Sequence, residues 1–140
     1  MVNAIALGAA GFWSVALIWG TQSLGLPFLP APIALPGAFM APGLVLAAMV
    51  ARCWASDHAT DRDVLRNTIT QAVLAFLIWP FVALTLGGAI TVVMGFAFAL
   101  SCAIYWLGAH VGAPLRQFGF AATFFTTVLA AVWSVVAWMG

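Results

Sequence analysis

Residues 66–86 have the sequence RNTITQAVLAFLIWPFVALTL, a polar start followed by an apolar run long enough to cross a bilayer. Arg66, Asn67 and Gln71 stand at the beginning of this run, next to the main cluster of charged residues. Polar side chains at the mouth of a membrane helix are costly unless they pair or line a site. The stretch therefore predicts a membrane-spanning helix whose polar first residues either pair with other groups or line a functional site.

The composition of the whole chain indicates that lipid is its solvent. Of the 140 residues, 66% are hydrophobic and only 5% are charged. A soluble domain is roughly one quarter charged, so that class is excluded. We therefore expect an all-α integral membrane protein whose main partner is the lipid bilayer. The net charge of +1 gives no electrostatic reason to bind nucleic acid.

Apolar runs separated by proline, glycine or charged residues predict five membrane crossings. They are expected at about Ala4 to Leu24, Gly37 to Trp54, Asp61 to Leu86, Ala89 to Gly108 and Gln117 to Met139. The prolines between the first two runs predict an extended connection, with the second helix beginning at Pro36 and Gly37. Met1-Val2-Asn3 lacks the basic residues that open a secretory signal, so the first helix is expected to be retained.

The connections between the later helices are short. Ser56 to Asp63 contains every acidic residue of the chain and is interpreted as a solvated loop. Gly87-Gly88 predicts a tight turn, which makes the third and fourth helices an antiparallel hairpin. Pro80 predicts a kink in the third helix. His110 to Arg116 is expected to be the last polar connection.

The arginines predict how the protein is oriented in the membrane. Five crossings place the loops after the second and fourth helices on one side, and these loops hold Arg52, Arg62, Arg66 and Arg116. The positive-inside rule makes that side cytoplasmic. The N-terminus is then cytoplasmic and the C-terminus lies on the opposite side.

The two cysteines, Cys53 and Cys102, are isolated and have neither CxxC nor zinc-site spacing. They are interpreted as small apolar packing residues. No metal site is predicted.

Polar residues of three helices are expected to meet at the cytoplasmic mouth. Asn67, Thr70 and Gln71 share a face of the third helix, as Ser101, Tyr105 and Gly108 do on the fourth, and Arg116 precedes the fifth. An arginine and a tyrosine hydroxyl converging with amide side chains could hold a ligand that bears a carboxylate or a thiolate. Alternatively, Tyr105 and Arg116 are interface anchors, and Asn67 and Gln71 bridge helices.

Three segments of the sequence together resemble the MAPEG family, the membrane-associated proteins in eicosanoid and glutathione metabolism, which has bacterial members. They are RNTITQ at 66–71, YWLGA at 105–109 and GAPLRQFGF at 112–120. The resemblance divides the chain into residues 1–35, an additional N-terminal membrane helix with a proline-rich connection, and residues 36–140, a MAPEG-like four-helix membrane domain. It implies a homotrimer in the bacterial inner membrane, with glutathione bound between subunits near the cytoplasmic face.

The resemblance also implies which residues form the site. Asn67 matches the Asn of the family's NTxEQ-type motif, and Tyr105 matches the aromatic residue of its RxxFxxGY-type motif. Arg116 matches the Arg implied in activating the glutathione thiolate. The implied glutathione-binding residues are Asn67, Gln71, Tyr105 and Arg116, with Arg116 catalytic if the protein is active.

Three departures from the family pattern fall in the same region. Thr70 stands where the family has Glu, Cys102 where it has Arg, and Ala109 where it has Tyr. Losing a Glu and an Arg together leaves no unpaired charge in the membrane. It also removes the groups that would clamp a zwitterionic tripeptide.

Three functional hypotheses follow. The first is a MAPEG-like protein with an eroded glutathione site that is a non-catalytic structural or accessory subunit of a membrane complex. The second is a glutathione-dependent transferase or peroxidase that acts on lipophilic electrophiles, with Arg116 favouring the thiolate nucleophile. The third is a small transporter or a protein next to pigments or quinones, in which aromatic side chains face cofactors.

Overall fold

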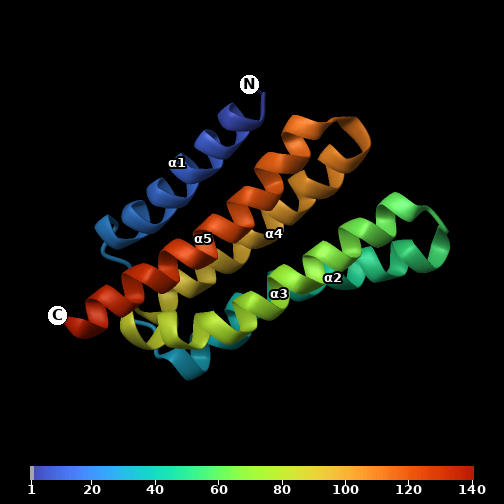
Figure 1. Cartoon of the computed structure of the whole chain (residues 1–140). Coiled ribbons are helices and arrows are strands. Elements are labelled where there is room, and N and C mark those ends of the chain that lie inside the picture. The colour runs from blue at the N-terminus through green and yellow to red at the C-terminus, as the bar shows by residue number, and fades with distance from the viewer. Residues whose placement is uncertain (1) are drawn as a thin grey trace.

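The computed structural model describes residues 2–140, and side chains from residue 4 onward, as a bundle of five α-helices (Figure 1). They are α1 (Val2–Ser23), α2 (Ala31–Ala55), α3 (Ala59–Thr85), α4 (Gly88–Val111) and α5 (Ala113–Met139). Each is long and apolar enough to cross a membrane, and the described part of the chain contains no strand. The predicted all-helical integral membrane protein with five candidate crossings is confirmed. The side chains of Met1-Val2-Asn3, on which the signal-peptide argument rests, lie outside the described residues.

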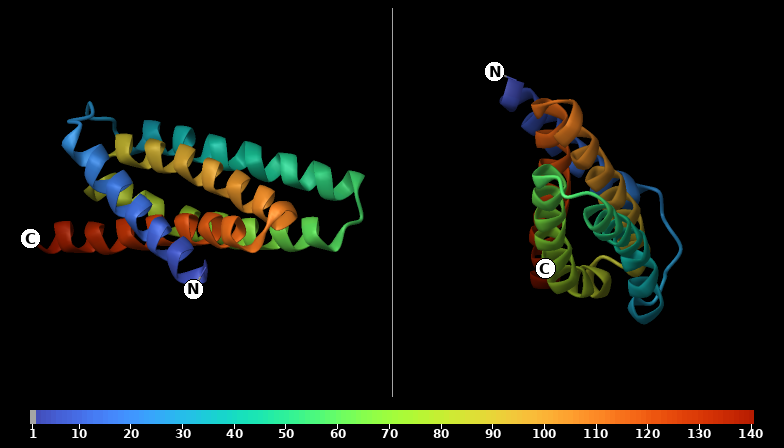
Figure 2. Two further views of the ribbon diagram at one scale, coloured as in Figure 1. Left: turned by 90° about the horizontal axis from the view of Figure 1, so that it is seen from above. Right: turned by 90° about the vertical axis from the view of Figure 1, so that its right-hand side faces the viewer.

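Helix α4 is the centre of the bundle, because it packs against each of the other four helices. Helices α2 and α3 form an antiparallel pair on one side of it (Figure 2). Helix α5 packs on α3 and α4, and α1 lies along α5 with a minor contact to α4. The described part of α1 does not touch α2 or α3, so α1 is attached to the bundle mainly through α5.

Two helix starts differ from the sequence prediction. Helix α2 begins at Ala31 and not at Pro36, so the extended connection ends at Pro30. Pro32 lies in the first turn, where its missing N–H costs no hydrogen bond, and the bundle tolerates Pro36 and Pro42 inside the helix. Helix α5 begins at Ala113, and only Gly112 separates it from α4. The expected polar connection from His110 to Arg116 is therefore mostly helical.

Glycines at three positions of α4 and α5 let helix backbones meet. A Cβ on Gly95 would collide with the carbonyl oxygen of Ala38 in α2. A Cβ on Gly119 would collide with the backbone of Tyr105, and one on Gly108 with the backbone of Arg116. Small residues allow this close approach in membrane bundles.

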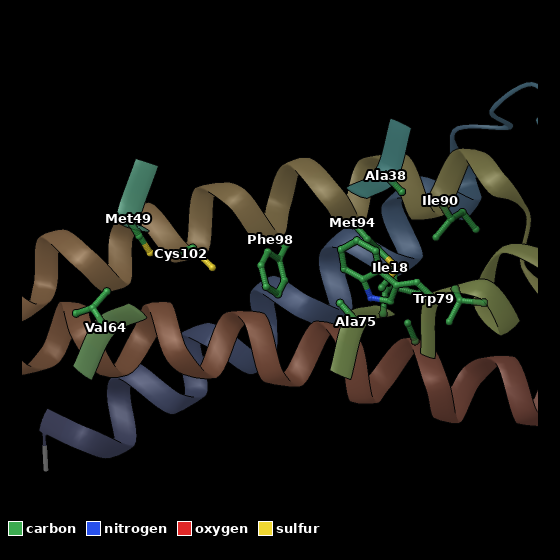
Figure 3. Close-up of a cluster of buried hydrophobic side chains, with 12 residues drawn as sticks. Ile18, Ala38, Met49, Val64, Ala75, Trp79, Ile90, Met94, Phe98 and Cys102 are labelled. Carbon is green, nitrogen blue, oxygen red and sulfur yellow. The ribbon is translucent and has the colours of Figure 1, made fainter. Parts of the chain in front are cut away.

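The main apolar core lies where α2, α3 and α4 meet (Figure 3). Trp79 of α3 is 1% exposed; its ring stacks on Phe39 at 5.5 Å between centroids and meets Phe98 edge-on at 5.8 Å. Aromatic pairs in these geometries add to the free energy of simple area burial. The core therefore holds α2, α3 and α4 together, and Ile18 of α1 and Ala130 of α5 also belong to it.

Helix α1 is held against α5 by a seam of small side chains. Ala6, Ala10 and Ser14 follow each other at four-residue spacing on α1, and so do Ala122, Thr126, Ala130 and Ser134 on α5; all are buried. The hydroxyls of Ser14 and Thr126 lie 3.0 Å apart and form a hydrogen bond between the two helices. The seam has the composition of a close membrane-helix contact.

Candidate functional site

The charged residues of the chain lie at one end of the bundle. The connection between α2 and α3 and the single-residue connection between α4 and α5 lie at the same end (Figure 1). Every Asp, Arg and His belongs to these connections or to the helix turns beside them. The opposite end, formed by residues 24–30 and 86–87, carries no charged side chain. We call the first end the charged end.

Asp61 is the centre of a polar cluster at the charged end. It lies in the first turn of α3 and is 3% exposed. Its Oδ2 accepts a hydrogen bond from the Ser56 hydroxyl at 2.9 Å, and its Oδ1 accepts one from the Trp106 indole nitrogen at 3.3 Å. The interpretation of residues 56–63 as a solvated loop is therefore wrong for this carboxylate, because donors from α2 and α4 replace its water.

Two cationic or ionisable side chains complete the Asp61 cluster. The Arg52 Nε lies 3.5 Å from Asp61 Oδ2, and the His110 Nε2 lies 3.3 Å from Oδ1. The His110 Nδ1 also faces the carbonyl oxygen of Trp106 at 3.0 Å, so only the doubly protonated ring donates to both oxygens. The cluster of Arg52, Ser56, Asp61, Trp106 and His110 joins the ends of α2 and α4 to the start of α3.

The expected shared face of Asn67, Thr70 and Gln71 is divided in the folded chain. Gln71 is buried, and its Oε1 has no hydrogen-bond partner. Asn67 is half-buried, whereas Thr70 is exposed and donates to the carbonyl oxygen of Arg66 in its own helix at 3.0 Å. Thr70 therefore lies at the exposed edge of the face that it shares with the two amides, whereas Gln71 lies inside the bundle.

Tyr105 and Arg116 come together where α4 and α5 cross. Tyr105 is half-buried, and its ring packs against Phe120 with 6.5 Å between centroids. Arg116 is exposed, lies within electrostatic range of the Tyr105 hydroxyl, and has no ion-pair partner among the described residues. Asp63 of α3 also lies within electrostatic range of the Tyr105 hydroxyl.

Cys102 lies inside the apolar core. It is 3% exposed and belongs to the buried cluster that includes Met49 and Val64 (Figure 3). Thr68 of α3 lies beside its thiol. The interpretation of this cysteine as a packing residue is supported, while Cys53 is only partly buried.

The principal hollows of the bundle lie away from the predicted site residues. A cleft of about 400 Å³ lies at the uncharged end, between residues 21–29 and 86–90. Smaller apolar grooves follow the α1–α5, α2–α4 and α2–α3 contacts. Among the described residues, no three His, Cys, Asp or Glu side chains come close enough to hold a metal ion.

Sequence reasoning missed the Asp61 cluster. A usable signal was present: Trp106 and His110 are spaced four residues apart at the end of one helix, and Asp61 opens a neighbouring one. Comparison with known proteins adds nothing to this picture, because no family model, curated protein or solved structure matches the chain.

Proposed function

We propose that this chain is a MAPEG-like integral membrane protein without a working glutathione site, and that it is a structural or accessory subunit of a membrane assembly. The proposal rests on the motif resemblance of residues 66–71 and 105–120. The same resemblance places the protein in the bacterial inner membrane. The charged end is assigned to the cytoplasm, because all four arginines lie at that end.

One observation is the main support for the absence of glutathione-dependent catalysis. At both positions where this chain replaces a charged residue of the family pattern, the new side chain has partners within the chain itself. The Thr70 hydroxyl bonds to its own helix, and Cys102 is buried against Met49 and Val64. Glutathione has separate ammonium and carboxylate groups, and a specific site would pair each with a group of opposite charge. Neither position 70 nor position 102 offers such a group.

A second observation supports the accessory role. Large apolar side chains are exposed along every helix, among them Phe12, Met40, Phe76, Phe96 and Val132. The described residues hold almost no mass outside the membrane in which a separate soluble activity could be located. Contacts with lipid or with other membrane helices are therefore the main interactions open to this surface.

The test is to purify the protein in a mild detergent from cells that express it at native level. We expect it to migrate with partner subunits in fixed ratio. Added glutathione should not change the melting temperature of the protein, and the absorbance of the glutathione thiolate should not appear. A homotrimer that binds glutathione, with binding lost in Arg116→Ala, would overturn the accessory role.

The alternative function is a glutathione-dependent transferase or peroxidase. The free guanidinium of Arg116 beside the Tyr105 hydroxyl favours it, because a cation near a thiol stabilises the thiolate. Asn67 and Gln71 would then supply hydrogen bonds to the peptide groups of glutathione. A model conjugation reaction with a lipophilic electrophile distinguishes the two functions: the accessory proposal expects no turnover above the Arg116→Ala background.

A further inference from the structure

An apolar groove runs along the lipid-facing contact between α2 and α4. It has a volume of about 160 Å³ and is lined by Val45, Ala48, Met49, Ala103 and Trp106. Val45 lies seven residues before Arg52 on α2, so the groove begins about 10 Å below that arginine along the helix axis. The groove therefore leads from the hydrocarbon up to the charged end.

Arg52 stands at the upper end of this groove. Its guanidinium carbon lies 4.9 Å from the centre of the Trp106 ring, which also lines the groove. The side chain is 50% exposed, and only Nε is directed at Asp61. The two Nη groups have no partner among the described residues, which leaves a planar pair of donors at headgroup depth.

The charge around Arg52 suits an anion. Asp61 is buried and lies within ion-pair distance of both Arg52 and His110, so its one negative charge is shared between two side chains. Arg62 is the other nearby cation that pairs with an acid, and its partner Asp57 is 94% exposed. A phosphodiester at the Nη groups of Arg52 would give these donors an anionic partner, and guanidinium groups bind phosphate oxygens in pairs.

We propose that the α2–α4 groove is a binding site for one anionic phospholipid. Its phosphate accepts hydrogen bonds from the Nη groups of Arg52, and one acyl chain lies in the groove between Val45 and Trp106. The comparable groove between α1 and α5, lined by Val15, Trp19, Leu129 and Trp133 among others, has no cation at its rim and is not selective.

The test is native mass spectrometry of the detergent-solubilised full chain with added dioleoyl phosphatidylglycerol or dioleoyl phosphatidylcholine. These lipids have the same acyl chains, so the difference between their binding affinities reports the effect of the headgroup alone. We expect the first phosphatidylglycerol to bind about tenfold more tightly than phosphatidylcholine, the size expected of one charge-assisted contact. Equal affinity for the two lipids would overturn the site.

Three variants assign the binding to this groove. Arg52→Gln should abolish the headgroup preference, and Ala103→Leu should weaken binding of both lipids by filling the groove. Arg62→Gln is the control, since it removes the same charge at an exposed position away from the groove. Loss of preference in Arg62→Gln equal to that in Arg52→Gln would indicate diffuse attraction and overturn the site.

Arg52 also contacts Asp61, so its variant could fail to fold. Ala103→Leu leaves that contact intact and keeps the proposal testable. If Ala103→Leu binds phosphatidylglycerol as tightly as the natural chain, the acyl chain does not occupy the groove and the proposal fails.

Discussion

The indole nitrogen of Trp106 donates a hydrogen bond to the carboxylate of Asp61 across 3.3 Å, although 45 residues separate them in the sequence. This contact ties the last turns of α4 to the first turn of α3. Arg52 and Ser56 bring the end of α2 to the same carboxylate. One buried acid therefore fastens three helices at the charged end, which makes it the first residue to test.

Asp61→Asn should lower the melting temperature of the detergent-solubilised protein by several degrees. The substitution keeps the volume but removes the charge, which leaves Arg52 and His110 without their common partner. Asp57→Asn is the matched control, because its salt bridge to Arg62 is exposed and contributes little. Similar shifts for the two variants would contradict the central place given to Asp61.

Gly95→Ala should destabilise the fold by about 1–3 kcal/mol, because the added methyl group forces α2 away from α4. The methyl would meet the carbonyl oxygen of Ala38, which belongs to the backbone and cannot rotate aside. Gly43→Ala is the control: nothing lies within 4 Å of its Cβ position, and alanine is the better helix former. Reversible unfolding in mixed micelles measures both changes.

Ser14→Ala combined with Thr126→Val should reveal a coupling of about 0.6 kcal/mol, the average for polar pairs between membrane helices. The two hydroxyls lie 3.0 Å apart across the seam of α1 and α5. A double-mutant cycle measures the coupling. Ser23→Ala paired with Thr126→Val is the control cycle, since Ser23 bonds to Gly20 in its own helix and should show no coupling.

Cys102→Arg should prevent folding or cost at least about 3 kcal/mol, because it buries an unpaired charge. Thr70→Glu should be tolerated, because position 70 is exposed. Together the two substitutions introduce the charged residues that the MAPEG pattern has at these two positions. A double variant that folds and binds glutathione would show that position 102 can open to a ligand, contrary to its packing with Met49 and Val64.

Asp57→Cys should react with a membrane-impermeant maleimide only in inverted vesicles, and Phe28→Cys only in spheroplasts. Positions 57 and 28 are 94% and 86% exposed and lie at opposite ends of α2. Both variants are made without the natural cysteines, so that only the new thiol reacts. Labelling of both from one side would contradict a membrane-spanning α2, and the reverse pattern would overturn the cytoplasmic assignment of the charged end.

The sequence predicted the number of helices well, because lipid imposes a length and a composition on each crossing. It also predicted the turn at Gly87 and the charged end. The sequence predicts the start of α2 five residues too late, at Pro36. From the sequence, a proline inside a membrane helix cannot be told apart from a proline in the first turn of one. The existence of each helix follows from the composition of its apolar run, whereas the residue at which it begins depends on packing against neighbouring helices.

The candidate site was less predictable. Tyr105 and Arg116 lie within electrostatic range of each other, because a single residue joins α4 to α5 and the two helices pack closely beside it. The burial of Asp61 was not foreseen, because composition alone does not tell a solvated acid from one bonded to a distant indole. Its partners come from α2, from the connection after α2 and from α4. The close approach of α2 to α4 depends on the backbone contact at Gly95.

The separation of charge toward one end also bears on how the chain enters a membrane. An insertion that keeps the charged end on its side of origin moves only residues 24–30 and 86–87 across as connecting segments. Neither segment contains an ionised side chain, so no step of such an insertion carries a formal side-chain charge through hydrocarbon. The α1–α2 and α3–α4 pairs can therefore enter as helical hairpins, and the contacts at Asp61 form only afterwards, when the helices assemble.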